Sequence, residues 1–294
     1  MISFFSNIFG YVLNWIYILI HNYGFAIIIF SVLVKLAMLP LSIKQQKTMK
    51  KNEKVQKEMK ILQIKHKGNP EMLNQEVMEL YKREKINPFG GCLTVILQFV
   101  LLISMFYLVR SPLTFMRKID KSAIDAKIIA IEESDSSNTI NKTYPEISIV
   151  KYVQQNNLTD DEMYINMNFL GLDLSNIPQE NLQDFKVFII PALYIISSVI
   201  SMRISTASMS KKVKEENGES TELTNDKDNN EMDQAEMSEQ MNKTMSWMMP
   251  VLAVSISLVA PLGLALYWLV NNIMMIIERL FLNKMFSREE DENA

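Results

Sequence analysis

Hydrophobic residues occur along this chain in long blocks that are separated by charged and polar segments. The block at 23–43, YGFAIIIFSVLVKLAMLPLSI, can cross a bilayer, because a spanning helix needs roughly 20 mostly apolar residues. Its single charge, Lys35, falls near its middle. Lys44, the first residue beyond the block, is about 13 Å further along a helix, so the Lys35 stem cannot reach the interface by snorkelling. The pattern predicts a spanning helix whose cation faces a partner or a wet cavity.

Three further blocks predict four more spans. The block at 89–110 contains Gln98, and the block at 185–205 carries Pro191 and several serines. The block at 245–282 would reach about 57 Å as one helix, against a hydrocarbon core of about 30 Å. Because Ala260-Pro261-Leu262-Gly263 interrupts it, we predict two short spans, about 246–260 and 264–281, joined by an outer turn. Spans this short are expected either to thin the local bilayer or to be held upright in it.

Residues 1–22 are apolar but not uniformly so, and they contain no Lys or Arg. Ser3, Asn7 and Asn14 recur at helical spacing among aromatic residues. This pattern favours an amphipathic helix that lies in the outer interface. The alternative is a first spanning helix, which would invert the topology of everything after it.

The segment at 44–88 is strongly charged, with twelve Lys and Arg against six Glu. Gly68-Asn69-Pro70 is a turn signal, and apolar residues recur at helical spacing on both sides of it, which predicts a helical hairpin. A basic excess directly after a span indicates the cytoplasmic side. We interpret the hairpin as a docking arm for an incoming chain, a ribosome or anionic headgroups; the alternative is a solvated loop without a task. The candidate docking residues are Lys50, Lys54, Met59 and Tyr81.

The remaining segments are polar and are predicted to lie outside the membrane. The segment at 111–184 has twelve acidic against six basic residues, which favours the outer side; within it, 132–143 is expected to be unstructured and 168–174 to lie on the membrane surface. Residues 206–244 predict a disordered cytoplasmic linker, and 283–294 an acidic cytoplasmic tail. The sum is an all-α integral membrane protein with five spans, its N-terminus outside and its C-terminus inside.

Composition narrows the class of function. Hydrophobic residues make up 48% of the 294 residues, and the charges are confined to the segments between the blocks, as in multi-pass membrane proteins. One cysteine and two histidines make a His/Cys metal site unexpected. The chain has no Gly-rich phosphate loop and no motif of a catalytic nucleophile or of nucleic-acid binding. We therefore predict no enzymatic activity, no catalytic residues and no cofactor.

The polar residues inside the spans indicate the chemistry of the protein. Five spans are too few for a transporter built from two repeats. No carboxylate falls in any predicted span before Glu278, at the very end of the last one, so Lys35 is expected to be an unpaired cation in a half-open, water-filled groove. The candidate groove residues are Lys35, Gln98, Trp268 and Asn271.

Three groups of residues resemble one family in both order and spacing. The first is Asn22-Tyr-Gly-Phe-Ala-Ile-Ile-Ile with Val34-Lys35-Leu36 and Leu39-Pro40-Leu41; the second is Glu84-Lys-Ile-Asn-Pro-Phe-Gly-Gly-Cys-Leu93 with Gln98; the third is Met249-Pro-Val251 with Pro261-Leu-Gly263 and Leu266-Tyr-Trp268. They resemble the YidC/Oxa/Alb membrane protein insertases, most closely bacterial YidC of the Gram-positive type. The resemblance implies five helices around a hydrophilic groove that is open to cytoplasm and lipid, with a mobile cytoplasmic helical hairpin. The chain departs from the family in having Lys35 where Arg is usual, and Thr94 and Val100 where prolines are usual.

The resemblance implies an insertase and chaperone of the bacterial cell membrane that moves nascent membrane-protein segments into the bilayer, alone or with the Sec translocon. Its implied partners are nascent membrane proteins, the lipid bilayer, the ribosome and the Sec translocon. One alternative is a small-solute or anion transporter that uses Lys35 as its binding charge; it would need polar outer halves, which offer little beyond Ser104, Ser255 and Ser257. Another is a scaffold or assembly factor that acts through the two long polar loops.

Overall fold

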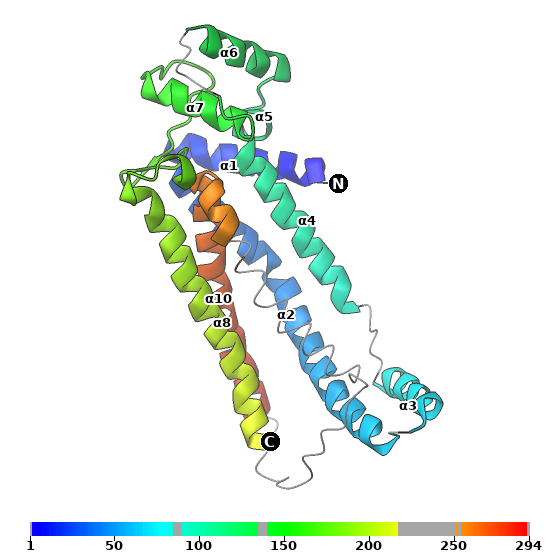
Figure 1. Cartoon of the computed structure of the whole chain (residues 1–294). Helices are drawn as coiled ribbons and strands as arrows, with labels where there is room; N and C mark the ends of the chain where they lie inside the picture. Colours follow the sequence, from blue (N-terminus) through cyan, green and yellow to red (C-terminus); the bar gives the residue numbers. More distant parts are fainter. Residues whose placement is uncertain are drawn as a thin grey trace.

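The computed structural model describes residues 2–66, 68–84, 90–134, 140–216, 251 and 254–292. Helices dominate these residues, and their only strands are a two-residue antiparallel pair, which confirms the predicted all-α class. Four long helices run roughly along the length of the molecule (Figure 1). They are α2 (Tyr23–Lys65), α4 (Gly90–Arg110), α8 (Ile189–Glu216) and α10 (Leu262–Glu292).

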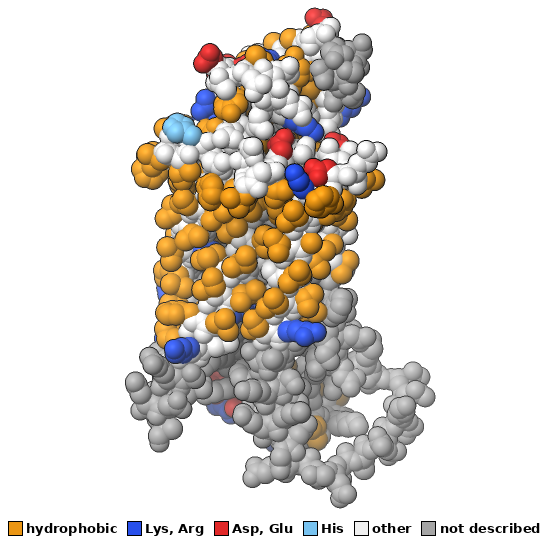
Figure 2. All heavy atoms as spheres, turned by 90° about the vertical axis from the view of Figure 1, so that its left-hand side faces the viewer, with side chains coloured by type: hydrophobic (Ala, Val, Ile, Leu, Met, Phe, Trp, Pro, Cys, Tyr) orange, Lys and Arg blue, Asp and Glu red, His pale blue; other side chains and the backbone are white. Residues whose placement is uncertain are grey.

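Four helical segments are long and apolar enough to cross a membrane, and α4 contributes a shorter apolar one, Phe99–Arg110. The four are Ser3–Ile20, Tyr23–Thr48, Phe185–Ile204 and Leu262–Met285. Figure 2 shows apolar side chains covering the middle of one face, below a more polar upper end. Of the predicted span at 246–260, the structure describes only 251 and 254–260, with 254–259 helical. The number of five spans therefore stays a prediction.

The first helix, α1 (Ile2–Ile20), lies across the ends of the long helices rather than beside them (Figure 1). It buries Leu13 and Ile16 against the core and exposes Trp15 and Leu19, both at 64%. Gly10 brings α1 against the backbone of α5 (Pro112–Phe115), since a Cβ at Gly10 would lie 1.9 Å from the carbonyl oxygen of Phe115. A crosswise helix with one exposed apolar face fits the outer interface, which stays our prediction for 1–22.

The predicted span at 23–43 and the first helix of the predicted hairpin form one continuous helix, α2, about 65 Å long. The Asn22 side chain caps it by accepting a hydrogen bond from the N–H of Phe25. After a turn at His66–Asn69, α3 (Pro70–Arg83) packs back against the end of α2. Val55 and Leu80 are buried between the two helices. No helix boundary therefore separates the spanning part of α2 from its charged part.

The segment at 111–184 folds into a cap over one end of the bundle of long helices (Figure 1). Apolar residues of α6 (Lys121–Ser134) and α7 (Pro145–Gln155) form its core. The buried Glu146 carboxylate accepts hydrogen bonds from the N–H and the hydroxyl of Thr114, and burial raises its pKa. The expectation that 132–143 is unstructured is wrong for its ends, because 132–134 complete α6 and Ile140 is buried; residues 135–139 lie outside the described part.

The segment at 168–174 packs on the start of α2, and its place on the membrane surface stays a prediction. Strands β1 (Asn168–Phe169) and β2 (Leu172–Asp173) form a hairpin whose Phe169 ring packs on Gly24 and Phe25, while Leu170 at its turn is 77% exposed. The backbone on either side of the hairpin accepts hydrogen bonds from the first residues of two long helices. The N–H of Tyr23 donates to Asn166 O, that of Leu262 to Asn176 O, and that of Gly263 to Leu174 O. This part of the cap therefore holds the starts of α2 and α10 together.

Two helices extend past their predicted boundaries. After the 3-10 turn η2 (Phe185–Phe188), α8 passes residue 205 and runs to Glu216, into the predicted linker at 206–244, whose remaining residues lie outside the described part. Helix α10 passes residue 281 and runs to Glu292, through most of the predicted tail at 283–294. The apolar segment of α10, Leu262–Met285, has 24 residues, or about 36 Å of helix, so a short last span does not supply a reason for bilayer thinning.

Replacing Gly10 by Ala tests the packing of α1 on the cap. The added methyl group would overlap the backbone carbonyl of Phe115, which cannot rotate away, so we expect a loss of about 1–3 kcal/mol in stability. Thermal unfolding in detergent measures it. Gly68→Ala is the matched control, because a Cβ at Gly68 meets nothing within 4 Å. An equal unfolding temperature for both variants would contradict the close approach.

Candidate functional site

An ion pair joins α2 to α10 inside the apolar part of the molecule. Lys35 Nζ lies 3.2 Å from Glu278 Oε2, and the two side chains are 18% and 14% exposed. Counted along their helices, Lys35 lies about 18 Å from the start of α2 and Glu278 about 24 Å from the start of α10. Both distances are shorter than a hydrocarbon core of about 30 Å. The pair therefore belongs to the spanning part of both helices.

The expectation of an unpaired Lys35 is wrong. It rested on placing Glu278 at the very end of a span that stopped at residue 281, whereas α10 continues for more than three further turns to Glu292. Glu278 is consequently an interior residue of its helix and reaches α2. In a low-dielectric setting the two charges stabilise each other, and removing either one leaves the other uncompensated. Both side chains keep part of their surface exposed, so the pair is not sealed.

A second polar cluster lies between α8 and α10. The side-chain amide of Asn272 donates to the hydroxyls of Ser197 at 2.9 Å and Ser198 at 3.0 Å. Asn272, both serines and Ser201 are buried. Four small polar side chains thus line one helix contact, where hydrogen bonds between helices favour a single register.

The candidate groove residues lie on more than one face of the bundle. Trp268 faces α8, with its ring 6.2 Å from that of Tyr194. Asn271 lies seven residues before Glu278, two helical turns, and therefore on the same face of α10 as the ion pair. The side chain of Gln98 is outside the described part of the chain. The structure thus places Asn271 with Lys35 and Glu278, and Trp268 with the neighbouring polar cluster.

Of the four candidate docking residues of the hairpin, the structure describes the side chains of two. Tyr81 Oη donates to Met59 Sδ at 3.8 Å, so these two side chains contact each other across the hairpin. The side chains of Lys50 and Lys54 lie outside the described part. The exposed apolar surface of the hairpin comes from residues that the sequence analysis did not single out: Ile61, Ile64, Met72 and Met78. Docking by the hairpin stays a prediction.

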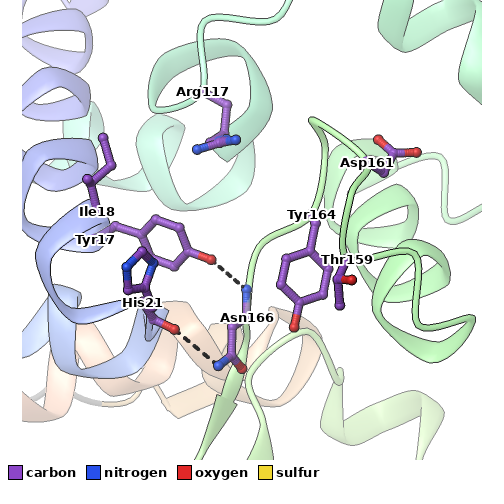
Figure 3. A pocket seen from close by; sticks show the side chains of 8 residues that line it. All are labelled: Tyr17, Ile18, His21, Arg117, Thr159, Asp161, Tyr164 and Asn166. Carbon is purple, nitrogen blue, oxygen red and sulfur yellow. Dashed lines mark hydrogen bonds between the residues drawn. The ribbon is translucent and has the colours of Figure 1, made fainter.

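A cavity of about 480 Å³ lies where the end of α1 meets the cap (Figure 3). Most of its polar groups already bond to protein. Tyr17 Oη accepts from the N–H of Asn166, whose side chain donates to His21 O, and the Arg117 guanidinium donates to Glu162 O. The bonds of Asn166 attach the cap to the end of α1, those of Arg117 lie within the cap, and we assign the cavity a structural role.

Comparison with known proteins identifies relatives of this chain. The family model described as "60Kd inner membrane protein" matches residues 15–290. A protein of Chlorobium phaeovibrioides is 48% identical over 102 residues, which are 35% of this chain and 18% of that protein. One of Pelodictyon phaeoclathratiforme is 42% identical over 123 residues, 42% of this chain and 21% of that protein. One of Francisella tularensis subsp. novicida is 42% identical over 107 residues, 36% and 19% respectively.

Each of these three relatives carries the name "Membrane protein insertase YidC". The matched segments cover only about a fifth of the length of each relative, from 18% to 21%. The family model, by contrast, covers nearly the whole of this chain. The family assignment therefore rests on the match to the family model, and the names of the relatives indicate which activity to test.

Asn272→Ala tests the polar contact between α8 and α10. It removes two buried hydrogen bonds, each worth about 0.6 kcal/mol on average between membrane helices, so we expect a loss of about 1 kcal/mol in a detergent unfolding assay. Asn271→Ala is the matched control, since Asn271 is the adjacent residue and lies on the face toward α2. A double-mutant cycle with Ser198→Ala should show coupling. Additive losses would mean that the hydrogen bond between Asn272 and Ser198 contributes nothing to stability.

Proposed function

The chain belongs to the 60Kd inner membrane protein family, and from this premise we propose that it is a membrane protein insertase. Its apolar helices and its family make it a multi-pass cell-membrane protein. The observation that carries the proposal is the Lys35–Glu278 pair, a partly exposed charged site inside an apolar bundle. The names of the three relatives support it.

In the proposed mechanism, the polar flank of a nascent membrane segment leaves water and enters a groove beside α2 and α10. Lys35 and Asn271 then supply polar contacts that replace part of the flank's lost hydration, which lowers the cost of its desolvation. The apolar part of the segment passes sideways into lipid. Nascent membrane proteins and lipid are the proposed partners, with the ribosome and the Sec translocon as further ones.

The orientation belongs to the same proposal. Helices α2 and α8 both leave the apolar zone through basic segments, which include Lys44 and Lys51 on α2 and Arg203 on α8. Basic residues flanking spans favour the cytoplasmic side. We therefore place the α2–α3 hairpin and the C-terminus inside, and the cap and α1 outside.

The alternative of a solute or anion transporter draws no support from the three relatives, which are all named insertases. The scaffold hypothesis assigns the function to the long polar segments. Deleting 217–233 tests it, because this deletion begins beyond the end of α8, whereas a deletion of 132–143 would also remove the last residues of α6. An insertase should tolerate the loss of 217–233.

Lys35 variants test the insertase proposal in proteoliposomes. For a single-span substrate with an acidic translocated tail, Lys35→Ala and Lys35→Glu should lower insertion by about tenfold, the equivalent of about 1.4 kcal/mol of lost interaction. Lys35→Arg keeps the charge and should retain most of the activity. Lys44→Ala, an exposed position on the same helix, is the control. Equal insertion by all variants would remove Lys35 from the mechanism.

Because Lys35→Ala leaves Glu278 without its cation, a structural defect must be separated from a functional one. The double variant Lys35→Ala/Glu278→Ala has neither charge, and it should unfold at about the temperature of the unaltered protein. If the groove needs a cation, the double variant still inserts poorly. Recovery of full insertion in the double variant would show that the uncompensated carboxylate, rather than the missing cation, caused the loss.

A further inference from the structure

We propose that Glu278 is a resident counterion that an acidic residue of the incoming segment must displace from Lys35, so that competition between the two carboxylates sets substrate selectivity. This inference rests on the proposed insertase function and deepens it. It assigns a role to a residue on α10 that neither the family resemblance nor the names of the relatives point to. Its basis is the 3.2 Å contact between the two side chains.

The composition of the spans makes Glu278 the natural competitor. Within the four described helical segments that are long enough to span, Glu278 is the one carboxylate, as their sequences show. No other acidic residue in those segments can neutralise Lys35 from within the bundle. In the substrate-free protein the charge of Lys35 is therefore already balanced by Glu278. An incoming acidic side chain must compete with Glu278 for Lys35.

Exchange of one carboxylate for another preserves the charge balance at Lys35. A neutral flank offers no anion, and its entry either leaves the pair intact or separates two charges without replacement, which is strongly unfavourable in a low-dielectric site. An acidic flank takes the place of Glu278, and Lys35 stays paired throughout. An acidic flank therefore gains an ion pair with Lys35 at the cost of releasing Glu278, whereas a neutral flank gains no ion pair with Lys35.

A second cation lies next to Glu278 and can stabilise its carboxylate after it leaves Lys35. Arg279 follows Glu278 directly in α10, is half-buried, and interacts electrostatically with it. Glu278 also keeps 14% of its side chain exposed, so it does not need to cross a sealed core to leave Lys35. The cost of releasing Glu278 is thereby reduced.

A basic flank meets the opposite situation. It is repelled by Lys35, and it can pair with Glu278 only by leaving Lys35 uncompensated. The pair as a whole is neutral and repels a basic flank less than a lone cation would; the flank is rejected because pairing with Glu278 leaves Lys35 without a counterion. Such rejection matches the general scarcity of Lys and Arg in translocated flanks of membrane proteins.

Glu278→Gln tests the inference, because the amide keeps the shape of the side chain but cannot hold Lys35 as an anion. Three single-span substrates carry Asp, Asn or Lys at one position of an otherwise identical translocated tail. A photocrosslinker replaces Met274, about one helical turn before Glu278 on α10. Removing the competitor should raise the ratio of Asp to Asn crosslinks by about fivefold or more, the usual lower range of coupling between two binding events.

Two further variants make the measurement specific. Glu278→Asp keeps the charge on a shorter stem, holds Lys35 less closely, and should raise the same ratio by a smaller factor. Glu289→Gln removes a carboxylate eleven residues further along α10 and should leave the ratio unchanged. Thermal unfolding of every variant checks folding, and Glu278→Asp carries the test if Glu278→Gln does not fold.

The possible outcomes distinguish a failure of the Glu278 proposal from a failure of the insertase proposal. If the unaltered protein inserts the substrates and the Asp to Asn ratio is the same in the Glu278 variants, Glu278 is not a competitor and the insertase proposal stands. If folded Glu278→Gln protein fails with all three substrates alike, Glu278 is required for another reason and the inference is wrong. If the unaltered protein inserts none of them, the proposed function itself fails.

Discussion

An ammonium group and a carboxylate cannot each stand alone in the middle of an apolar helix, and this constraint governs how α2 and α10 meet. Desolvating either charge is costly, and the two charges offset that cost only when they lie within contact distance. Lys35 and Glu278 satisfy the condition at 3.2 Å, although 243 residues separate them in the chain. The two helices must therefore be neighbours, and they must meet at one particular relative height.

The cap sets that height from outside. Backbone carbonyls of Asn166, Leu174 and Asn176 accept hydrogen bonds from the first residues of α2 and α10, so one short segment fixes the outer ends of both helices. The Phe169 ring fills the space that Gly24 leaves open, which brings the same segment tightly against α2. A folded cap thus holds the ion pair in register from roughly 20 Å away, counted at the rise of an α-helix.

Local patterns in the sequence predicted local features well. The apolar block around Lys35, the interruption at Pro261 and the turn at Gly68-Asn69-Pro70 all identify real features of the described chain. The partner of Lys35 could not be found in this way, because apolar composition marks where a span leaves the lipid and not where its helix ends, and α10 continues as a helix through polar residues. The cap was missed for a related reason: charge counts describe its surface, while its fold depends on contacts such as Glu146 with Thr114 that join distant residues.

The continuity of α2 links the ion pair to the hairpin, but the link contains a weak point. Pro40 lies five residues beyond Lys35 and has no N–H to donate, so the carbonyl of Leu36 loses its usual helical partner between the site and the hairpin. Before this point α2 is held by the cap and by Glu278; beyond it α2 packs against α3, where Val55 and Leu80 are buried. Helices bend most readily at such prolines. The position of Lys35 is consequently determined by the cap and α10, and a tilt of the hairpin is not transmitted to it through an unbroken hydrogen-bond ladder.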